Sequence, residues 1–249
     1  MTVDDDNDIS GLRLIGAAVA DARETMGRAA VPGITTAALD EIGERVLRRH
    51  GARSAPQLAY GFPGVTCISV NDELAHGVPS PSKRLSAGDI VNIDVSAELN
   101  GYWADTGASF AVDQISEDDQ ILLQATRTAL TEAMEGTRAG ALRRDVGRVV
   151  ERRAEAEGFF VIEELAGHGV GRHIHEEPEV PNVYVATDRY RFREGQVLTI
   201  EPFFTVNPTF VVEDEDGWTL STADGCRGAQ FEHTIILTRG RPIVVTDWA

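Results

Sequence analysis

The sequence contains one phrase twice, as Ala87-Gly88-Asp89-Ile90-Val91-Asn92-Ile93-Asp94 and as Glu194-Gly195-Gln196-Val197-Leu198-Thr199-Ile200-Glu201. In both copies a glycine precedes an apolar strand pattern that ends in an acid. A second phrase lies upstream of each copy, Ala75-His76-Gly77-Val78 in the first half and Gly167-His168-Gly169-Val170 in the second. Two halves that fold alike can place their acids face to face across a pseudo-two-fold axis. The repeat therefore predicts a duplicated metal site.

Helical spacing of apolar residues predicts four amphipathic helices, over residues 9–30, 37–50, 116–136 and 142–157. A segment rich in strand patterns fills residues 66–111. Gly33 and Gly140 have the same separation as Gly88 and Gly195, so a helix and a strand are duplicated together. No linker rich in proline, glycine or serine divides the halves. We therefore expect a single α/β domain over residues 9–249, built from two related lobes at about 9–111 and 117–249.

The composition restricts the possible partners of the chain. Its 249 residues carry a formal net charge of −17, from 40 acidic and 23 basic residues. This charge disfavours direct binding of nucleic acid or of an anionic membrane, because both require a basic surface. Residues 1–8 are acidic and polar, and we expect them to form a flexible leader. With no signal peptide pattern, no run of ~20 apolar residues and two cysteines outside any CxxC spacing, the sequence predicts a cytoplasmic protein with free thiols.

A hairpin is predicted at Asn100-Gly101, because both residues of this dipeptide accept the positive φ angles of a two-residue turn. Such a turn pairs Ser96 with Asp105, which places Asp94 diagonally beside Asp105 on one face of the hairpin. Diagonal Cβ atoms lie ~7–8 Å apart, a distance that two carboxylates can close by pointing at one cation. The opposite face is apolar, so both acids should be buried, where unpaired charges are costly.

The second half adds Glu201 and Glu232, each within an apolar strand pattern, and His168. Four carboxylates and an imidazole are too many ligands for one ordinary cation, but they suit two cations that share bridging carboxylates. Oxygen-rich ligation with one imidazole fits Co, Mn, Fe or Zn, and the absence of cysteine from the set argues against a structural zinc site.

The combined motifs resemble those of methionine aminopeptidases, from the first predicted helix to about Thr246. The matching residues are His76, Asn92-Ile93-Asp94, Asp105-Thr106, Gly167-His168-Gly169-Val170-Gly171-Arg172, His175-Glu176-Glu177-Pro178, Thr199-Ile200-Glu201-Pro202 and Gln230-Phe231-Glu232-His233-Thr234. The resemblance implies the pita-bread fold, with two pseudo-symmetric lobes of antiparallel sheet covered by helices. The short interval between His175 and Glu201 leaves no room for the helical insertion of the type II enzymes, so the short type I form is implied.

The resemblance also implies roles for individual residues. Asp94 would chelate one metal, Asp105 and Glu232 would bridge the two metals, and His168 with Glu201 would complete the second site. A water or hydroxide between the metals would be the nucleophile, with Glu201 as the proton shuttle. His175 matches the histidine that stabilises the tetrahedral oxyanion, and His76 matches the one that orients the scissile amide.

Specificity for methionine requires an apolar slot for its thioether. The positions that match this slot are Phe62, Cys67 and Trp218, with Tyr60 nearby. Three residues depart from the family pattern. Ile174 and Leu165 stand where the family usually or frequently has an aromatic residue, and Phe203 stands where it usually has methionine. We expect Phe203 and Leu165 to reshape the wall near the penultimate residue of the substrate.

Two other functions are compatible with this fold. One is an aminopeptidase that acts before proline, although such relatives usually carry a large N-terminal domain. The other is a pita-bread binding protein that has lost catalysis, although such proteins lack part of the ligand set. The expected partners of an active enzyme are N-terminal peptide substrates, bound by a monomer. The net acidity leaves open how it would approach nascent chains at a ribosome.

Overall fold

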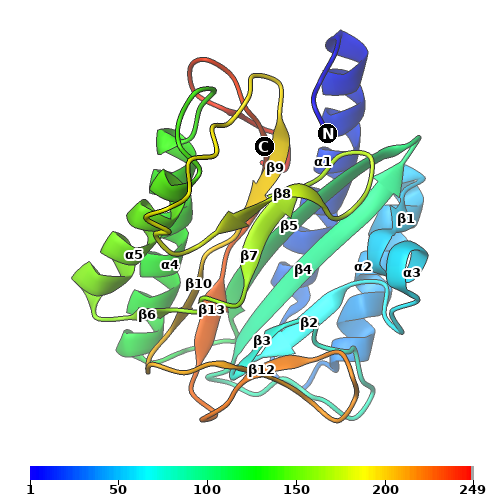
Figure 1. Cartoon of the computed structure of the whole chain (residues 1–249). Helices are drawn as coiled ribbons and strands as arrows, with labels where there is room; N and C mark the ends of the chain where they lie inside the picture. The colour runs from blue at the N-terminus through cyan, green and yellow to red at the C-terminus, as the bar shows by residue number, and fades with distance from the viewer. Residues whose placement is uncertain (248–249) are drawn as a thin grey trace.

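The computed structural model describes residues 1–247 and places five helices among several short antiparallel sheets (Figure 1). The helices are α1 (Asp6–Ala29), α2 (Thr36–His50), α3 (Ala55–Tyr60), α4 (Glu117–Gly136) and α5 (Arg144–Glu157). Their ends follow from local chemistry. Thr35 caps α2 by accepting the Ala38 N–H, and Gly51 ends it in the left-handed conformation. Ser116 caps α4, whose first turn carries three acids at the positive end of the helix dipole.

The first half is organised around a long hairpin, formed by β4 (Ile90–Leu99) and β5 (Tyr102–Ala111). Its register pairs Leu99 with Tyr102 and Ser96 with Asp105, as the Asn100-Gly101 turn predicts. Both turn residues have positive φ angles, of 54° and 82°. Strands β1 (Arg53–Ser54) and β2 (Cys67–Val70) pair with β4 on its other edge.

The second half contains a five-stranded antiparallel sheet in the order β15-β14-β9-β7-β8. These strands are β7 (Ala166–Gly169), β8 (Glu176–Pro181), β9 (Val197–Ile200), β14 (His233–Ile236) and β15 (Ile243–Val244). Two three-stranded sheets complete the fold, in the orders β13-β10-β6 and β11-β12-β3. Their strands are β3 (Glu73–Ala75), β6 (Phe160–Val161), β10 (Phe203–Thr205), β11 (Val211–Glu213), β12 (Leu220–Thr222) and β13 (Gly228–Gln230).

Each half has its own hydrophobic core. Helices α1 and α2 cover the first half, and Ile15 and Val19 pack there with Val91 and Ile93 of β4. Helices α4 and α5 cover the second half, where Leu122 belongs to the same buried cluster as the strand residues of β9 and β14. Burying a large aliphatic side chain contributes roughly 1.5–3 kcal/mol, so these cores fix the strands that carry the acids.

The two halves meet along β5 and the segment just before β14. The Glu232 N–H donates to the Gly107 carbonyl at 2.8 Å, and the Thr106 hydroxyl donates to the Glu232 carbonyl at 2.9 Å. Thr234 completes the connection, because its hydroxyl accepts from the Asp105 N–H and donates to the Asp105 carbonyl. These contacts bring acids from the two halves side by side.

Three features differ from the sequence predictions. Helix α1 begins at Asp6 instead of Ile9, because the Asp5 carboxylate caps it by accepting the N–H groups of Asn7 and Asp8. The short helix α3 was not predicted. Residues 1–8, expected as a flexible leader, make specific contacts: the Val3 N–H donates to the Gly195 carbonyl at 2.8 Å, and residues 6–8 belong to α1.

No helix within residues 1–247 is long and apolar enough to cross a membrane. This agrees with the absence of a long apolar run in the sequence.

Candidate active site

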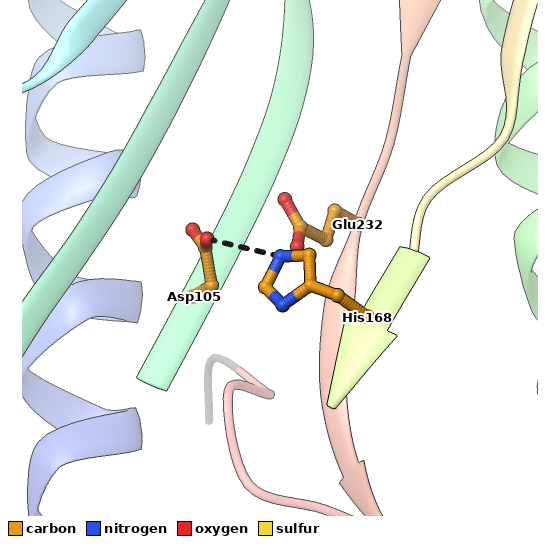
Figure 2. A group of neighbouring side chains, drawn as sticks. All are labelled: Asp105, His168 and Glu232. Carbon is orange, nitrogen blue, oxygen red and sulfur yellow. Dashed lines mark ion pairs between the residues drawn. The ribbon is translucent and has the colours of Figure 1, made fainter. Parts of the chain in front are cut away.

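Three potential metal ligands from both halves converge at the seam (Figure 2). Asp105 lies on β5, His168 on β7, and Glu232 immediately before β14. One ligand atom of each residue lies within 4.8 Å of the ligand atoms of the other two. The carboxyl oxygens of Asp105 and Glu232 include two buried atoms, Asp105 Oδ1 and Glu232 Oε1, that have no hydrogen-bond partner.

The two unpartnered oxygens indicate whether these side chains could bind a cation. Buried carboxylate oxygens almost always have a donor, so two of them without one, on adjacent acids, mark positions that a bound cation or a proton would satisfy. A divalent cation coordinated by both acids and by the His168 ring would do so. The donor set of this cluster therefore fits a metal ion.

Asp94 and Glu201 extend the cluster along one cavity, whose lining includes Asp94, Asp105, His168 and Glu201. Burial raises the pKa of Asp94 and of Glu201 well above the usual range, and the charge of Asp105 raises both further. Burial raises the pKa of Asp105 itself to about 6. The pKa of Glu232 is also raised well above its usual range, by burial and then by the charges of the other acids. Four acids in this position repel one another unless protons or cations neutralise them.

The ring of His168 is oriented for ligation by its own backbone. Its Nδ1 donates to the Gly169 carbonyl at 2.9 Å, which leaves the Nε2 lone pair free. Nε2 lies 3.8 Å from Asp105 Oδ2 and 3.6 Å from Glu201 Oε1. Burial lowers the pKa of His168 to about 3, so the ring is neutral and able to bind a cation at physiological pH.

Sequence reasoning assigned no role to three residues that hold these acids. Gln230 donates from Nε2 to Glu232 Oε2 at 3.1 Å, and Asn92 in turn donates from Nδ2 to Gln230 Oε1 at 2.7 Å. Thr199 donates to Glu201 Oε1 at 3.0 Å and accepts from the His168 N–H. A signal for two of them was present in the sequence. Asn92 and Thr199 occupy equivalent places in the repeated phrase, two residues before the acid, and alternate residues of a strand share a face.

The repeated glycines have a steric reason. Gly88 and Gly195 have positive φ angles of 93° and 76°, which turn the chain into β4 and β9. In the His-Gly-Val phrases, a Cβ on Gly77 would lie 2.2 Å from the Ile68 carbonyl oxygen. A Cβ on Gly169 would lie 2.4 Å from the Glu177 carbonyl oxygen. Glycine thus lets the backbone beside each histidine approach a neighbouring strand.

His76 and His175 both line the cavity, as do the sequence-predicted pocket residues. The cavity has a volume of about 710 Å³, and its lining also contains Phe62, Cys67, Leu165, Ile174, Phe203 and Trp218. Phe62 and Trp218 meet edge to face, with ring centroids 5.2 Å apart. Phe203 and Leu165 belong to one apolar cluster. The structure therefore brings together every residue that the sequence predicted for the site.

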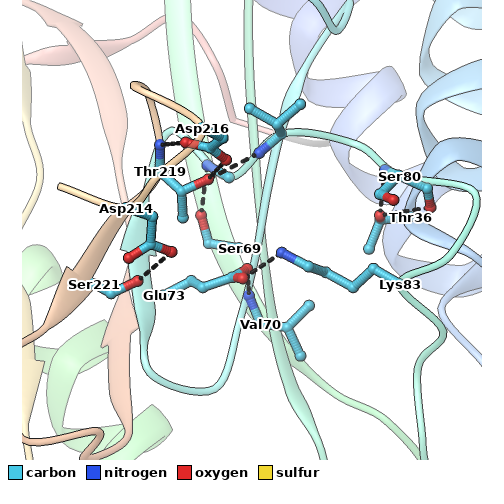
Figure 3. Close-up of polar contacts among 12 residues, drawn as sticks. Thr36, Ser69, Val70, Glu73, Ser80, Lys83, Asp214, Asp216, Thr219 and Ser221 are labelled. Atoms are coloured by element: carbon cyan, nitrogen blue, oxygen red, sulfur yellow. Dashed lines mark hydrogen bonds and ion pairs between the residues drawn. The ribbon is translucent and has the colours of Figure 1, made fainter.

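A polar network fixes the segments that carry His76 and Trp218 (Figure 3). Beside His76, the Gly77 N–H donates to the Ser69 hydroxyl, and the Val78 N–H donates to the Thr219 hydroxyl. The Asp216 carboxylate holds the loop around Trp218, because it accepts the Trp218 and Thr219 N–H groups, both at 2.8 Å. Two segments distant in sequence are thereby locked into one wall of the cavity.

Comparison with known proteins agrees with this geometry. Residues 10–239 match metallopeptidase family M24. The chain is 47% identical to methionine aminopeptidase 2 of Bacillus subtilis, over 99% of both chains. It is 33% identical to a methionine aminopeptidase from Thermotoga maritima, whose crystal structure it matches with a TM-score of 0.96 over 100% of both chains.

Prolidase from Pyrococcus furiosus also shares the fold, with a TM-score of 0.79. The identity is 21%, and the chain covers 66% of that protein, so this likeness concerns the fold alone. Between His175 and Glu201 the structure has strands β8 and β9 joined by a loop, with no helical insertion. These matches confirm the pita-bread fold expected from the sequence. The chain belongs to metallopeptidase family M24, and its full-length similarity within that family is to methionine aminopeptidases.

Proposed function

We propose that this protein is a metal-dependent aminopeptidase that removes the N-terminal methionine from nascent proteins and peptides. The observation that carries the proposal is the convergence of Asp105, His168 and Glu232, with two orphaned carboxylate oxygens, beside a cavity with an apolar wall. A buried acidic cluster of this kind suits cations, and the wall suits a thioether side chain. Full-length similarity to methionine aminopeptidases supports the same substrate.

The five candidate ligands suit two divalent ions, of Co, Mn, Fe or Zn. In this proposal Asp94 would hold one ion, His168 and Glu201 would hold the other, and Asp105 and Glu232 would contribute ligands to both. When bound, such ions supply a water nucleophile that is deprotonated near neutral pH and polarise the scissile carbonyl.

The remaining chemistry belongs to side chains of this protein. Glu201 accepts the proton of the attacking water and delivers it to the leaving amine, while the Thr199 hydroxyl holds one of its oxygens in place. His175 donates a hydrogen bond to the oxygen that becomes negative in the transition state. His76, which lines the same cavity, orients the scissile amide. Phe62, Cys67, Ile174 and Trp218 surround the methionine side chain and exclude water from it, whereas Phe203 lines the wall beside the second residue of the substrate.

A peptide assay after metal exchange tests this function. Protein stripped by a chelator should not cleave Met-Ala-Ser, and adding back Mn, Fe, Co or Zn should restore release of methionine. Activity that survives complete metal removal would contradict the metal requirement. Preferential cleavage of Xaa-Pro peptides would assign the chain to the proline-directed branch of the fold. Cleavage of neither peptide by the metal-loaded protein would indicate a binding protein without catalysis.

Phe203→Met should change the preference for the second residue of the substrate. Phe203 is buried and lines the cavity, and methionine is more flexible than the phenyl ring, so the variant should accept a larger penultimate side chain. We expect the ratio of kcat/KM for Met-Val-Ser and Met-Ala-Ser to rise by about 3–10-fold, since changes of a methylene or so in an apolar pocket have effects of this order. Identical cleavage profiles for the two proteins would contradict this role of Phe203.

The cellular setting proposed here follows from charge and topology. We propose a cytoplasmic monomer that acts on the N-termini of completed or growing chains without contacting nucleic acid. A net charge of −17 opposes association with the phosphate-rich surface of a ribosome. Co-sedimentation with ribosomes at low and physiological salt would measure this directly, and salt-resistant binding would indicate a local basic patch.

A further inference from the structure

Tyr60 makes a contact with His175 that neither the motif nor the proposed ligand set explains. The two residues are 115 positions apart and come from different halves of the chain. The phenol oxygen of Tyr60 lies 2.5 Å from Nδ1 of His175, and the ring centroids lie 5.6 Å apart. Tyr60 lines the cavity with about half of its surface exposed, whereas Phe62 is 4% exposed. Its ring therefore contributes less to an enclosed apolar wall than Phe62 does.

The backbone that carries Tyr60 is fixed at both ends. Tyr60 is the last residue of α3, which Ser54 caps at its start and which Gly61 ends with a φ angle of +70°. The Ser54 hydroxyl also donates to the Val65 carbonyl at 2.7 Å. The Asp40 carboxylate anchors the loop that follows α3, because it accepts the N–H groups of Val65 and Thr66. A side chain on such a support is held in place before substrate arrives.

The direction of the hydrogen bond follows from the states of the two groups. A neutral imidazole has one donor and one acceptor nitrogen, and the partner of one nitrogen determines which carries the proton. A phenol keeps its proton near neutral pH, because its ordinary pKa is about 10, and its hydrogen can point at an acceptor nitrogen. The hydroxyl thus donates, Nδ1 accepts, and Nε2 carries the hydrogen.

We propose that Tyr60 is a positioning residue, whose hydroxyl holds the His175 ring in the tautomer that presents Nε2–H to the substrate. The inference rests on the proposed role of His175 as the donor to the oxyanion. It gives that role a structural cause, because the contact of the His175 ring with the His168 ring, with centroids 4.3 Å apart, does not determine which nitrogen carries the proton. A donor that is already oriented stabilises developing charge without reorganisation.

The test compares Tyr60→Phe, which removes only the hydroxyl, with the wild-type metal-loaded enzyme on Met-Ala-Ser. We expect kcat to fall by about 10–100-fold while KM changes by less than about threefold, since misplacing a catalytic group has effects of this order. Leu58→Ala is the matched control, because it alters an exposed side chain of the same helix. It should leave both constants unchanged. A rise in KM alone for Tyr60→Phe would overturn the proposal and make Tyr60 a wall residue.

Two further measurements separate this inference from the proposed function. In the His175→Ala background, Tyr60→Phe should cost less than about twofold, and an undiminished cost there would overturn the proposal. ¹⁵N chemical shifts of labelled histidine should show the Nε2–H tautomer for His175 in the wild type and a mixture of tautomers in Tyr60→Phe. This signature is read without substrate, so it remains valid if methionyl peptides are not cleaved. Identical tautomers in both proteins would contradict the positioning role.

Discussion

Replacement of Asp105 by alanine will lower kcat/KM for Met-Ala-Ser by at least about 10³-fold and will leave the fold intact. Asp105 is at the centre of the cluster. Its carboxylate lies beside His168 and Glu232. Its charge raises the pKa of both Asp94 and Glu201. Loss of a group placed between two ions removes a ligand from both, so we expect metal content and turnover to fall together. Metal analysis and peptide kinetics on the same preparation measure both effects.

The control for this variant is Ser96→Ala. Ser96 is the residue directly opposite Asp105 in the hairpin register, so the substitution perturbs the same strand pair by a similar small volume. It should retain activity within about twofold and a full complement of metal. Circular dichroism should show the same secondary structure for wild type and both variants. Full activity in Asp105→Ala would exclude Asp105 as a bridging ligand.

The hairpin shows why part of this site could be predicted from the sequence. The turn at Asn100-Gly101 has a local signature, and once a two-residue turn is set, the pairing of Ser96 with Asp105 follows from counting. Alternation along β4 then places Asp94 on the cavity face. The repeated phrase extended this reasoning to Glu201, because a second copy of the strand carries its acid at the same position.

Other features have no local signature. Strands β10 to β13 are three residues each, too short for alternation to distinguish them from loop, and they are set by pairing with distant segments. The contact between Tyr60 and His175 depends on how the two halves dock, as does the chain of donors from Asn92 to Glu232. The acids could be identified from the sequence. Which of their oxygens receive a hydrogen bond, and which two do not, depends on how the two lobes pack together.

The contacts of residues 1–8 also could not be predicted from local sequence. Their composition, with Asp4, Asp5 and Asp6 in succession, is typical of a solvated segment. In the structure Asp8 is buried, where it accepts a hydrogen bond from the Tyr102 hydroxyl at 2.9 Å and forms an ion pair with Arg172 at 2.6 Å. Both partners lie far away in sequence, so no local pattern could have indicated the contact.

Without bound metal, Asp105→Asn will be more stable than the wild type at pH 7, the opposite of its effect on activity. Burial raises the pKa of Asp105 from 3.8 to about 6, so the folded protein holds this proton more tightly than the unfolded chain does. The stability that comes from protonation is complete below about pH 4 and is lost as the pH rises through about 6. Two pKa units correspond to about 3 kcal/mol, and asparagine, which never ionises, avoids this loss.

Thermal unfolding of chelator-treated proteins between pH 4 and pH 7 checks the prediction. The variant should unfold at a temperature higher by roughly 5–10 °C at pH 7, given the usual shift of about 2–4 °C per kcal/mol for a chain of this size, and the difference should vanish near pH 4. Comparing two proteins that differ at one residue cancels the titration of groups that Asp105 does not influence, such as the buried His233, whose pKa burial lowers to about 3.

Saturating metal should reverse this order of stability. A ligand at 1,000 times its dissociation constant stabilises the folded state by about 4.1 kcal/mol, which exceeds the variant's advantage of about 3 kcal/mol, and only the wild type has the full set of acids to bind it. If the metal-free variant instead unfolds at a lower temperature than the wild type at pH 7, protein donors must already satisfy the Asp105 carboxylate. In that case its orphaned oxygen would no longer support a cation site. Removing the charge of Asp105 should thus raise stability without metal and lower activity. Removing a residue needed only for folding would lower both.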